Sequence, residues 1–467
     1  MRTWTLLAGP VLCWLALCAT AAYGDWSAPG TVASSRVWQY SRPLAVLGLS
    51  GDGALVWHRE ERLNETLSGI EASTLNGGRW STAGVLASSR QGGVVFPALA
   101  SGVRGRAATV VWQNTGAIQT ASRSAGGPFG RAMTLPGRVQ GASNPQVAVG
   151  GGGAVGDGGT ATIVYTRPEH GLWIFTRPTG GRWRPVRSIP AISRSSIAEV
   201  QVARDRRGET ILAWLSGRHG NMLRVQTVVL GSNNRPERPP QTLLSGRRRD
   251  LGELRLQANA SGAAVLAWHE KLRDGSVSIE ASTRRGGGRF SRPVTVSGRR
   301  DTSELSVAID GGEHAAVAYT RALSTQPGTP EESSDGYPAY TQTAIVEVAT
   351  RAVGHGWSRP SEIAPRQPDS STFEPQLAGS ATGQGIMAIW TSARFRSSDT
   401  ATYTGRIEAA ATTPTGMWQT PSIVSPVDSF APTLALSAHG TAIAAWVTAT
   451  SSGQAIQTSE QPPTSHR

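Results

Sequence analysis

The sequence predicts an all-β chain in which one structural unit is repeated around a ring. A glycine turn, an alternating strand of small and branched residues and a closing aromatic residue recur along the chain, as in Gly262–Trp268. The closing aromatics are Trp57, Trp112, Tyr165, Trp214, Trp268, Tyr319, Trp390 and Trp446. A strand-rich repeat of about fifty residues is typical of propeller blades. The sequence therefore predicts a single β-propeller of about eight four-stranded blades.

Each unit is expected to contain four strands, which we call A to D from the ring axis outward. In the third unit they are expected at Pro145–Val149, Thr160–Thr166, Leu172–Arg177 and Arg182–Ser188. The A–B and C–D turns are short and rich in glycine, because tight hairpins need positive φ. The other connections, B–C and D–A, are longer and are predicted to share the opposite face.

The face formed by the B–C and D–A connections is the candidate binding face. It carries the largest insertion, Leu323–Tyr340, and a smaller one, Arg394–Tyr403. Function concentrates on long loops that a rigid scaffold holds in place. We therefore look for the site on this face.

The two ends of the chain are predicted to meet in one blade. Asp25–Pro29 matches the end of a repeat, such as Trp357–Pro360, and Ala455–Ser459 supplies only the third strand of the last unit. An N-terminal strand that completes the last blade would close the ring. Closure would also remove the open sheet edge that invites aggregation.

The first 24 residues are predicted to be a signal peptide. They hold Arg2, an apolar run from Leu6 to Leu17 and small residues before Asp25, which is the pattern of an exported chain. An uncleaved anchor is the alternative, but Gly9-Pro10 interrupts the run, which is short for a bilayer span. We expect a secreted, extracellular propeller over residues 25–461, a disordered tail over 462–467 and no later membrane span.

The chain is basic, and nearly all of its positive charge is arginine. The formal net charge is +13, and Lys271 is the only lysine. The bias toward Arg, Ala and Gly is typical of a high-GC genome, and attraction to an anionic cell-wall polymer is the functional alternative. Nucleic acid is not an expected partner, because aromatic residues are not interleaved among the basic ones.

The cysteine and histidine patterns predict neither a cofactor nor a metal site, and we expect a monomer. Cys13 and Cys18 both lie in the predicted signal peptide, so the remaining chain has no thiol. The histidines lack metal-ligand spacing. His269, which follows an anchor tryptophan, is retained as a candidate contact on the binding face.

Four consecutive units carry a glutamate at the mouth of strand A. These residues are Glu199, Glu253, Glu304 and Glu374, and the equivalent positions elsewhere are Arg42, Phe96, Asn144 and Ala431. Such carboxylates could bind a cation, an amine or sugar hydroxyls, or act as an acid and a base. The alternative is that each one pairs with an arginine of a nearby loop.

The D–A loops next to these glutamates contain short arginine runs. Arg247–Arg249 and Arg299-Arg300 lie in equivalent loops of neighbouring units, so Arg248 and Arg300 are candidate contacts for carboxylates, phosphates or sulfates. The alternative interpretation is that these arginines are solvated residues of surface loops. Tyr337 and Tyr340, in the largest insertion, are the candidate aromatic contacts.

The repeat resembles the secreted, sialidase-like β-propeller repeats of actinobacteria. The resemblance covers Asp25 to about Gln461, and Ser50–Trp57 is similar to the sialidase Asp-box with its glycine one place early. It implies the propeller fold, but no motif here fixes catalytic residues. Our leading hypothesis is a non-enzymatic propeller that binds an extracellular glycan or protein. The alternatives are a sialidase-like or other glycan-active hydrolase with its site at the channel mouth and a purely structural surface protein.

Overall fold

The fold was analysed in a computed structural model of the chain. It describes residues 26–462 except 50, 63–66, 91–92, 103–106, 125, 137–140, 151–158, 168–170, 179, 187–195, 219–220, 246–249, 299–300, 324–343, 365–369, 381–384, 396–402 and 414–415. The predicted fold class is confirmed, because the described residues form eight antiparallel sheets and no helix. The described residues therefore contain no helix that could cross a membrane. The predicted signal peptide and all but the first residue of the predicted tail lie outside the described residues.

The first four blades follow one another along the chain. Blade 1 has six strands because its first and last strands are each split in two: β2 (Trp38–Tyr40), β3 (Leu44–Leu47), β4 (Gly53–Glu61), β5 (Ser68–Asn76), β6 (Arg79–Trp80) and β7 (Gly84–Ser89). Blade 2 contains β8 (Val94–Ser101), β9 (Ala108–Asn114), β10 (Ala117–Arg123) and β11 (Met133–Thr134). Blade 3 contains β12 (Ser143–Gly150), β13 (Thr160–Arg167), β14 (Gly171–Arg177) and β15 (Arg184–Val186). Blade 4 contains β16 (Ser196–Arg204), β17 (Thr210–Arg218), β18 (Asn221–Leu230) and β19 (Gln241–Ser245).

The remaining four blades repeat the same order. Blade 5 contains β20 (Asp250–Ala258), β21 (Ala264–Lys271), β22 (Val277–Arg284) and β23 (Val294–Thr295). Blade 6 contains β24 (Thr302–Ile309), β25 (Ala315–Ala322), β26 (Ala344–Arg351) and β27 (Ser361–Glu362). Blade 7 contains β28 (Ser370–Gly379), β29 (Ile386–Phe395), β30 (Tyr403–Ala411) and β31 (Ser422–Ile423). Blade 8 contains β32 (Ser429–Leu436), β33 (Ala442–Thr450), β34 (Gly453–Gln461) and β1 (Gly30–Ser35).

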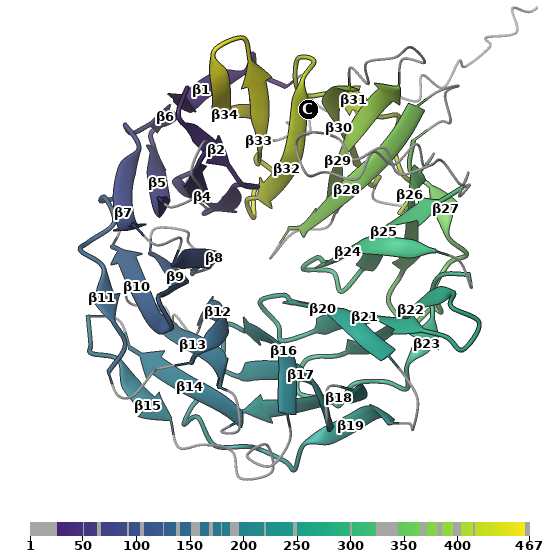
Figure 1. Cartoon of the computed structure of the whole chain (residues 1–467). Helices are drawn as coiled ribbons and strands as arrows, with labels where there is room; N and C mark the ends of the chain where they lie inside the picture. The colour runs from purple at the N-terminus through teal and green to yellow at the C-terminus, as the bar shows by residue number, and fades with distance from the viewer. Residues whose placement is uncertain are drawn as a thin grey trace, which may run out of the picture.

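The A strands surround the ring axis. Figure 1 shows β8, β12, β16, β20, β24, β28 and β32 nearest the centre, each followed outward by the other strands of its blade. Successive A strands contact one another, and β3 of blade 1 contacts β32 of blade 8. The D strands form the outer edge, and several are only two residues long. Short edge strands offer little template for pairing with another chain.

The predicted closure of the ring is confirmed. β1 pairs antiparallel with β34, with Gly30 opposite Thr458 and Ser35 opposite Gln454. The Ser27 N–H also donates to the Glu460 carbonyl at 2.8 Å. Figure 1 shows this meeting of the two chain ends as purple β1 beside yellow β34. Blade 8 therefore takes three strands from one end of the chain and one from the other.

The closing aromatics are buried in the hydrophobic core within the blades and between neighbouring blades. All eight are among the largest fully buried side chains. The residue opposite each one on strand C is Glu or Gln in seven blades, and Trp173 in blade 3. Trp57 Nε1 donates to Glu71 at 3.0 Å, and the Tyr319 hydroxyl donates to Glu347 at 2.9 Å. In these two blades the buried polar atom of the anchor thus gains a partner from the same sheet.

Buried or half-buried arginines join neighbouring blades at the A–B and C–D end of the sheets. In three blades an arginine at the end of strand C reaches back to the preceding blade. Arg123 donates to the Gly53 carbonyl, Arg177 donates to Ser122 Oγ at 2.6 Å, and Arg284 pairs with Glu209 at 2.8 Å. Part of the basic excess of the chain is therefore structural.

Candidate functional site

The glutamates predicted at the mouth lie at a bulge in strand A. The ladder between strands A and B slips there, for example between Gly252 and Arg255 in blade 5. Glu253, Glu304 and Glu374 occupy this bulge with φ of 49°, 55° and 57°. A left-handed backbone is unfavourable for a residue with a side chain, so each bulge needs compensating contacts. The glutamate side chains supply them.

Each of these carboxylates accepts a backbone N–H from the next blade. Glu253 accepts from Leu305 at 2.8 Å, Glu304 accepts from Glu374 at 2.6 Å, and Glu374 accepts from Ala431 at 2.8 Å. The acceptors lie in blades 5, 6 and 7, and the donors lie in blades 6, 7 and 8. The carboxylates therefore lie along the inner wall and join consecutive A strands. We call Glu199, Glu253, Glu304 and Glu374, with the N–H groups they bind, the glutamate belt.

Glu199 belongs to the belt but has a different backbone. In blade 4 the ladder slips between Ile197 and Val200, and Val200 lies directly opposite the anchor Trp214. In blade 5 the corresponding tryptophan, Trp268, faces the bulge itself. Glu199 is not one of the left-handed residues, and its two carboxylate oxygens accept both Glu253 N–H at 3.0 Å and Leu254 N–H at 2.8 Å. The four glutamates are thus equivalent in sequence but not in local conformation.

Glu253 also contacts two basic side chains of its own blade. Its carboxylate lies 3.0 Å from His269 Nδ1 and 3.2 Å from Arg255 Nη2. Burial acts to raise the pKa of Glu253, but the hydrogen bond and charge of His269, together with Arg255 and the Leu305 N–H, outweigh it and leave the pKa lowered. His269 therefore lies beside Glu253, and the lowered pKa favours the anionic form of this glutamate.

Glu304 and Glu374 form a second cluster, which blade 1 completes. Glu374 accepts the Thr391 hydroxyl at 2.9 Å and pairs with Arg42 Nη2 at 3.0 Å. Glu304 accepts the Thr320 hydroxyl at 2.6 Å. Burial raises the pKa of Glu304, and the Glu374 charge adds to this rise, whereas the hydrogen bonds from Thr320 and from the Glu374 N–H oppose it. Blades 6, 7, 8 and 1 therefore meet through one charged network.

The other predicted site residues cannot be placed in this network. Arg248, Arg300, Tyr337 and Tyr340 lie outside the described residues, as do the arginine runs expected to pair with the glutamates. The main described partners of the belt are backbone N–H groups, with Arg42 and Arg255 as its arginines. Of the predicted insertion at Arg394–Tyr403, both ends belong to strands, because Phe395 of β29 pairs with Tyr403 of β30.

Sequence reasoning missed the contribution of Arg255 and the contact made by Arg42. Arg255 follows Glu253 by two residues, and this i, i+2 spacing on a strand was an available signal. Arg42 was aligned with the glutamates, but its contact with blade 7 depends on ring closure. Both side chains remain partly exposed, Arg255 at 41% and Arg42 at 35%.

The mouth can recognise a ligand by hydrogen bonds and charge. It presents exposed guanidinium groups beside carboxylates whose positions are fixed by the backbone. Such an arrangement suits hydroxyl-rich or charged partners, since guanidinium groups donate and carboxylates accept. Over the described ranges, no group of three His, Cys, Asp or Glu side chains is arranged to hold a metal ion.

The eight sheets arranged around one axis define the class of the protein as an eight-bladed β-propeller. No protein-family model and no curated protein matches the sequence. An ulvan lyase of polysaccharide lyase family PL25, bound to -[GlcA(1-4)Rha3S]-, is similar in structure with a TM-score of 0.47, 10% identity, and coverage of 82% of this chain and 95% of the lyase.

Two further structures are similar at the same level. For Penicillium chrysogenum α-L-arabinanase with arabinobiose, the TM-score is 0.40 at 10% identity, covering 94% of this chain and 99% of the arabinanase. For Aleuria aurantia lectin with Fucα1-6GlcNAc, the TM-score is 0.38 at 10% identity, covering 69% of this chain and 95% of the lectin. These likenesses concern the fold alone.

Proposed function

We propose that this protein is an exported, non-enzymatic propeller that binds a glycan or protein ligand through the face formed by its B–C and D–A connections. The observation that carries the proposal is the glutamate belt. Both oxygens of Glu199, Glu253 and Glu374 have hydrogen-bond or ion-pair partners within the ring. A general acid or nucleophile needs an oxygen free for substrate. Carboxylates committed in this way favour recognition over catalysis.

The proposed ligand contacts at the mouth are the partly exposed Arg255 and Arg42, together with the more buried His269. Arg255 and His269 flank Glu253 on blade 5, and Arg42 projects from blade 1. The belt holds their carboxylate partners rigidly, which reduces the entropy lost on binding. A glycan is the favoured ligand, because each sugar hydroxyl can accept from a guanidinium and donate to a carboxylate.

The test is binding of residues 25–467 to a glycan array and to intact cell walls. We expect saturable binding that falls at least tenfold in Arg255→Gln/His269→Gln. The matched control is Arg359→Gln/His355→Gln, because both residues are exposed on the β26–β27 connection of the opposite face and the two double variants make the same substitutions. Equal loss in both variants, or binding of neither probe by the unmodified protein, would refute the mouth as the site.

A second candidate function, glycan hydrolysis at the mouth, is favoured by one observation. Burial raises the pKa of Glu304, while the neighbouring Glu374 pairs with Arg42. Two adjacent carboxyls whose environments differ in this way are typical of an acid and its partner. Release of reducing sugar from cell-wall polysaccharide, abolished in Glu304→Gln, would establish this function instead.

A further inference from the structure

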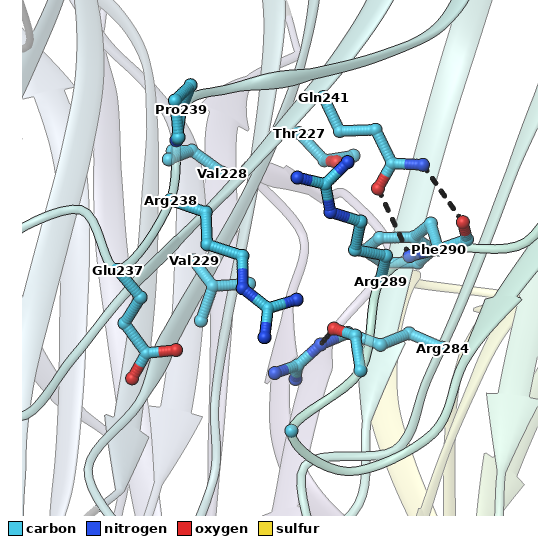
Figure 2. Close-up of a pocket in the computed structure, with 12 residues that line it drawn as sticks. Thr227, Val228, Val229, Glu237, Arg238, Pro239, Gln241, Arg284, Arg289 and Phe290 are labelled. Atoms are coloured by element: carbon cyan, nitrogen blue, oxygen red, sulfur yellow. Dashed lines mark hydrogen bonds between the residues drawn. The ribbon is translucent and has the colours of Figure 1, made fainter.

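A second polar site lies on the face opposite the mouth, between the outer hairpins of blades 4 and 5. The connection from β18 to β19 and the connection from β22 to β23 enclose a cavity of about 40 Å³. This is roughly the room needed by a small polar group or a few water molecules. Arg238 enters from blade 4, and Arg284 and Arg289 come from blade 5 (Figure 2). Three guanidinium groups thus line one small space.

The cavity is held open by contacts that cross the two blades. The Gln241 side chain of blade 4 donates to the Phe290 carbonyl at 2.9 Å and accepts from the Phe290 N–H at 3.2 Å, as the dashed lines in Figure 2 show. Arg284 is buried, donates to the Gly288 carbonyl at 2.8 Å and pairs with Glu209 at 2.8 Å. The frame of the site is therefore rigid before any ligand binds.

Arg238 and Arg289 take no part in this frame. Both are exposed, and neither makes an ion pair with any described residue. Figure 2 shows them extending from opposite hairpins toward the space between. The two connections carry five exposed arginines and a single acid, Glu237: the arginines are Arg235, Arg238, Arg285, Arg289 and Arg292. The local charge is therefore strongly positive and is not neutralised within the chain.

We propose that the cavity between the two hairpins, a groove lined by arginines, binds the oxyanion of an acidic polysaccharide, either a carboxylate or a sulfate ester. Paired guanidinium groups suit planar or tetrahedral oxyanions, because each presents two parallel N–H donors. One anionic group would sit between Arg238 and Arg289, above the buried Arg284. A polymer with repeated anionic groups would gain further from the surrounding arginines. This inference does not rest on the proposed mouth site, because the two lie on opposite faces.

The test compares two double variants of equal charge. Binding of polygalacturonate, dextran sulfate and neutral dextran is measured by calorimetry at 100 mM NaCl for the unmodified protein, for Arg238→Gln/Arg289→Gln and for Arg235→Gln/Arg285→Gln. We expect the first pair to weaken binding of the anionic polymer at least tenfold and the second, outside the cavity lining, less than threefold. Preference for one polymer identifies the oxyanion as carboxylate or sulfate.

Two results would overturn the proposal. An equal loss in both double variants would mean that only net charge attracts the polymer. Binding of neither anionic polymer by the unmodified protein would mean that the groove holds no such ligand. Because Arg238 and Arg289 are exposed and outside the frame, their replacement should leave the urea unfolding midpoint unchanged, so a loss of binding can be assigned to the site.

Discussion

Replacing Glu374 with alanine should weaken the ring at three blades at once. The Glu374 carboxylate accepts from Ala431 in blade 8 and from Thr391 in blade 7, and it pairs with Arg42 in blade 1. Alanine would leave the Ala431 N–H without its acceptor, at a bulge where Ala431 itself has φ of 53°. Hydrogen bonds to a charged group contribute about 1.5–3 kcal/mol each. Allowing for water at this partly exposed side chain, we expect a loss of about 3 kcal/mol in the free energy of unfolding.

Glu374→Gln separates the hydrogen bonds from the charge. The amide oxygen of glutamine can still accept from Ala431 and Thr391, so only the ion pair with Arg42 is lost. Since Arg42 is 35% exposed, that pair should contribute less than about 1 kcal/mol. The glutamine variant should therefore lie much closer to the unmodified protein than the alanine variant does.

Urea unfolding followed by tryptophan fluorescence measures both variants. Glu237→Ala is the control, because Glu237 is exposed on an outer hairpin and its loss should change stability by about 0.5 kcal/mol or less. The reasoning is refuted if alanine and glutamine destabilise equally, or if the alanine variant falls within the range of the control. Either result would mean that the belt does not join the blades energetically.

Three other predictions concern different parts of the ring. The raised pKa of Glu304 means that the folded protein binds the proton of this carboxyl more tightly than the unfolded chain does, so the contribution of Glu304 to stability is greatest below its unfolded pKa and falls as pH rises through its folded pKa. The urea midpoint of Glu304→Gln should therefore rise relative to that of the unmodified protein between pH 4 and pH 7. A difference that stays constant with pH would contradict this prediction. Ser34 and Ala455 face each other across β1 and β34. The double variant Ser34→Cys/Ala455→Cys should form a disulfide on oxidation that raises the free energy of unfolding by up to about 5 kcal/mol. Equal urea midpoints for the oxidised and reduced forms would argue against the closure of the ring by β1 and β34. Trp268→Ala should cost about 3–5 kcal/mol because Trp268 is fully buried, and Trp268→Tyr should cost clearly less, since other blades use tyrosine there; equal losses would count against the interchangeability of the anchors.

The architecture could be predicted from the sequence because the repeat depends on residue patterns that are local in the chain. The anchor aromatics and the alternating strand before each one depend on neighbours within one blade. The shared ending of Asp25–Pro29 and the other repeats was enough to predict closure, since a missing fourth strand must come from somewhere. The positions of the glutamates on strand A followed from the same alignment.

The direction of the glutamate side chains could not be predicted. It depends on a left-handed bulge and on N–H groups that belong to the next blade, about fifty residues away in the chain. The shifted bulge at Glu199 shows that even an exact alignment does not fix this conformation. The groove between Arg238 and Arg289 was missed for a related reason, because the two hairpins become neighbours only when blades 4 and 5 pack together.

The pairing of β1 with β34 has a consequence for how the chain is made. Synthesis produces β1 before the other strands of the propeller and β34 after them, so β1 has no strand to pair with until the seven intervening blades have been made. Seven blades can form in order during synthesis, but blade 8 can be completed only when both β1 and β34 are present. A product truncated before β34 would expose an unpaired edge, which is a target for proteases and for association with other chains. Pairing of β1 with β34 therefore distinguishes a complete propeller from an interrupted one.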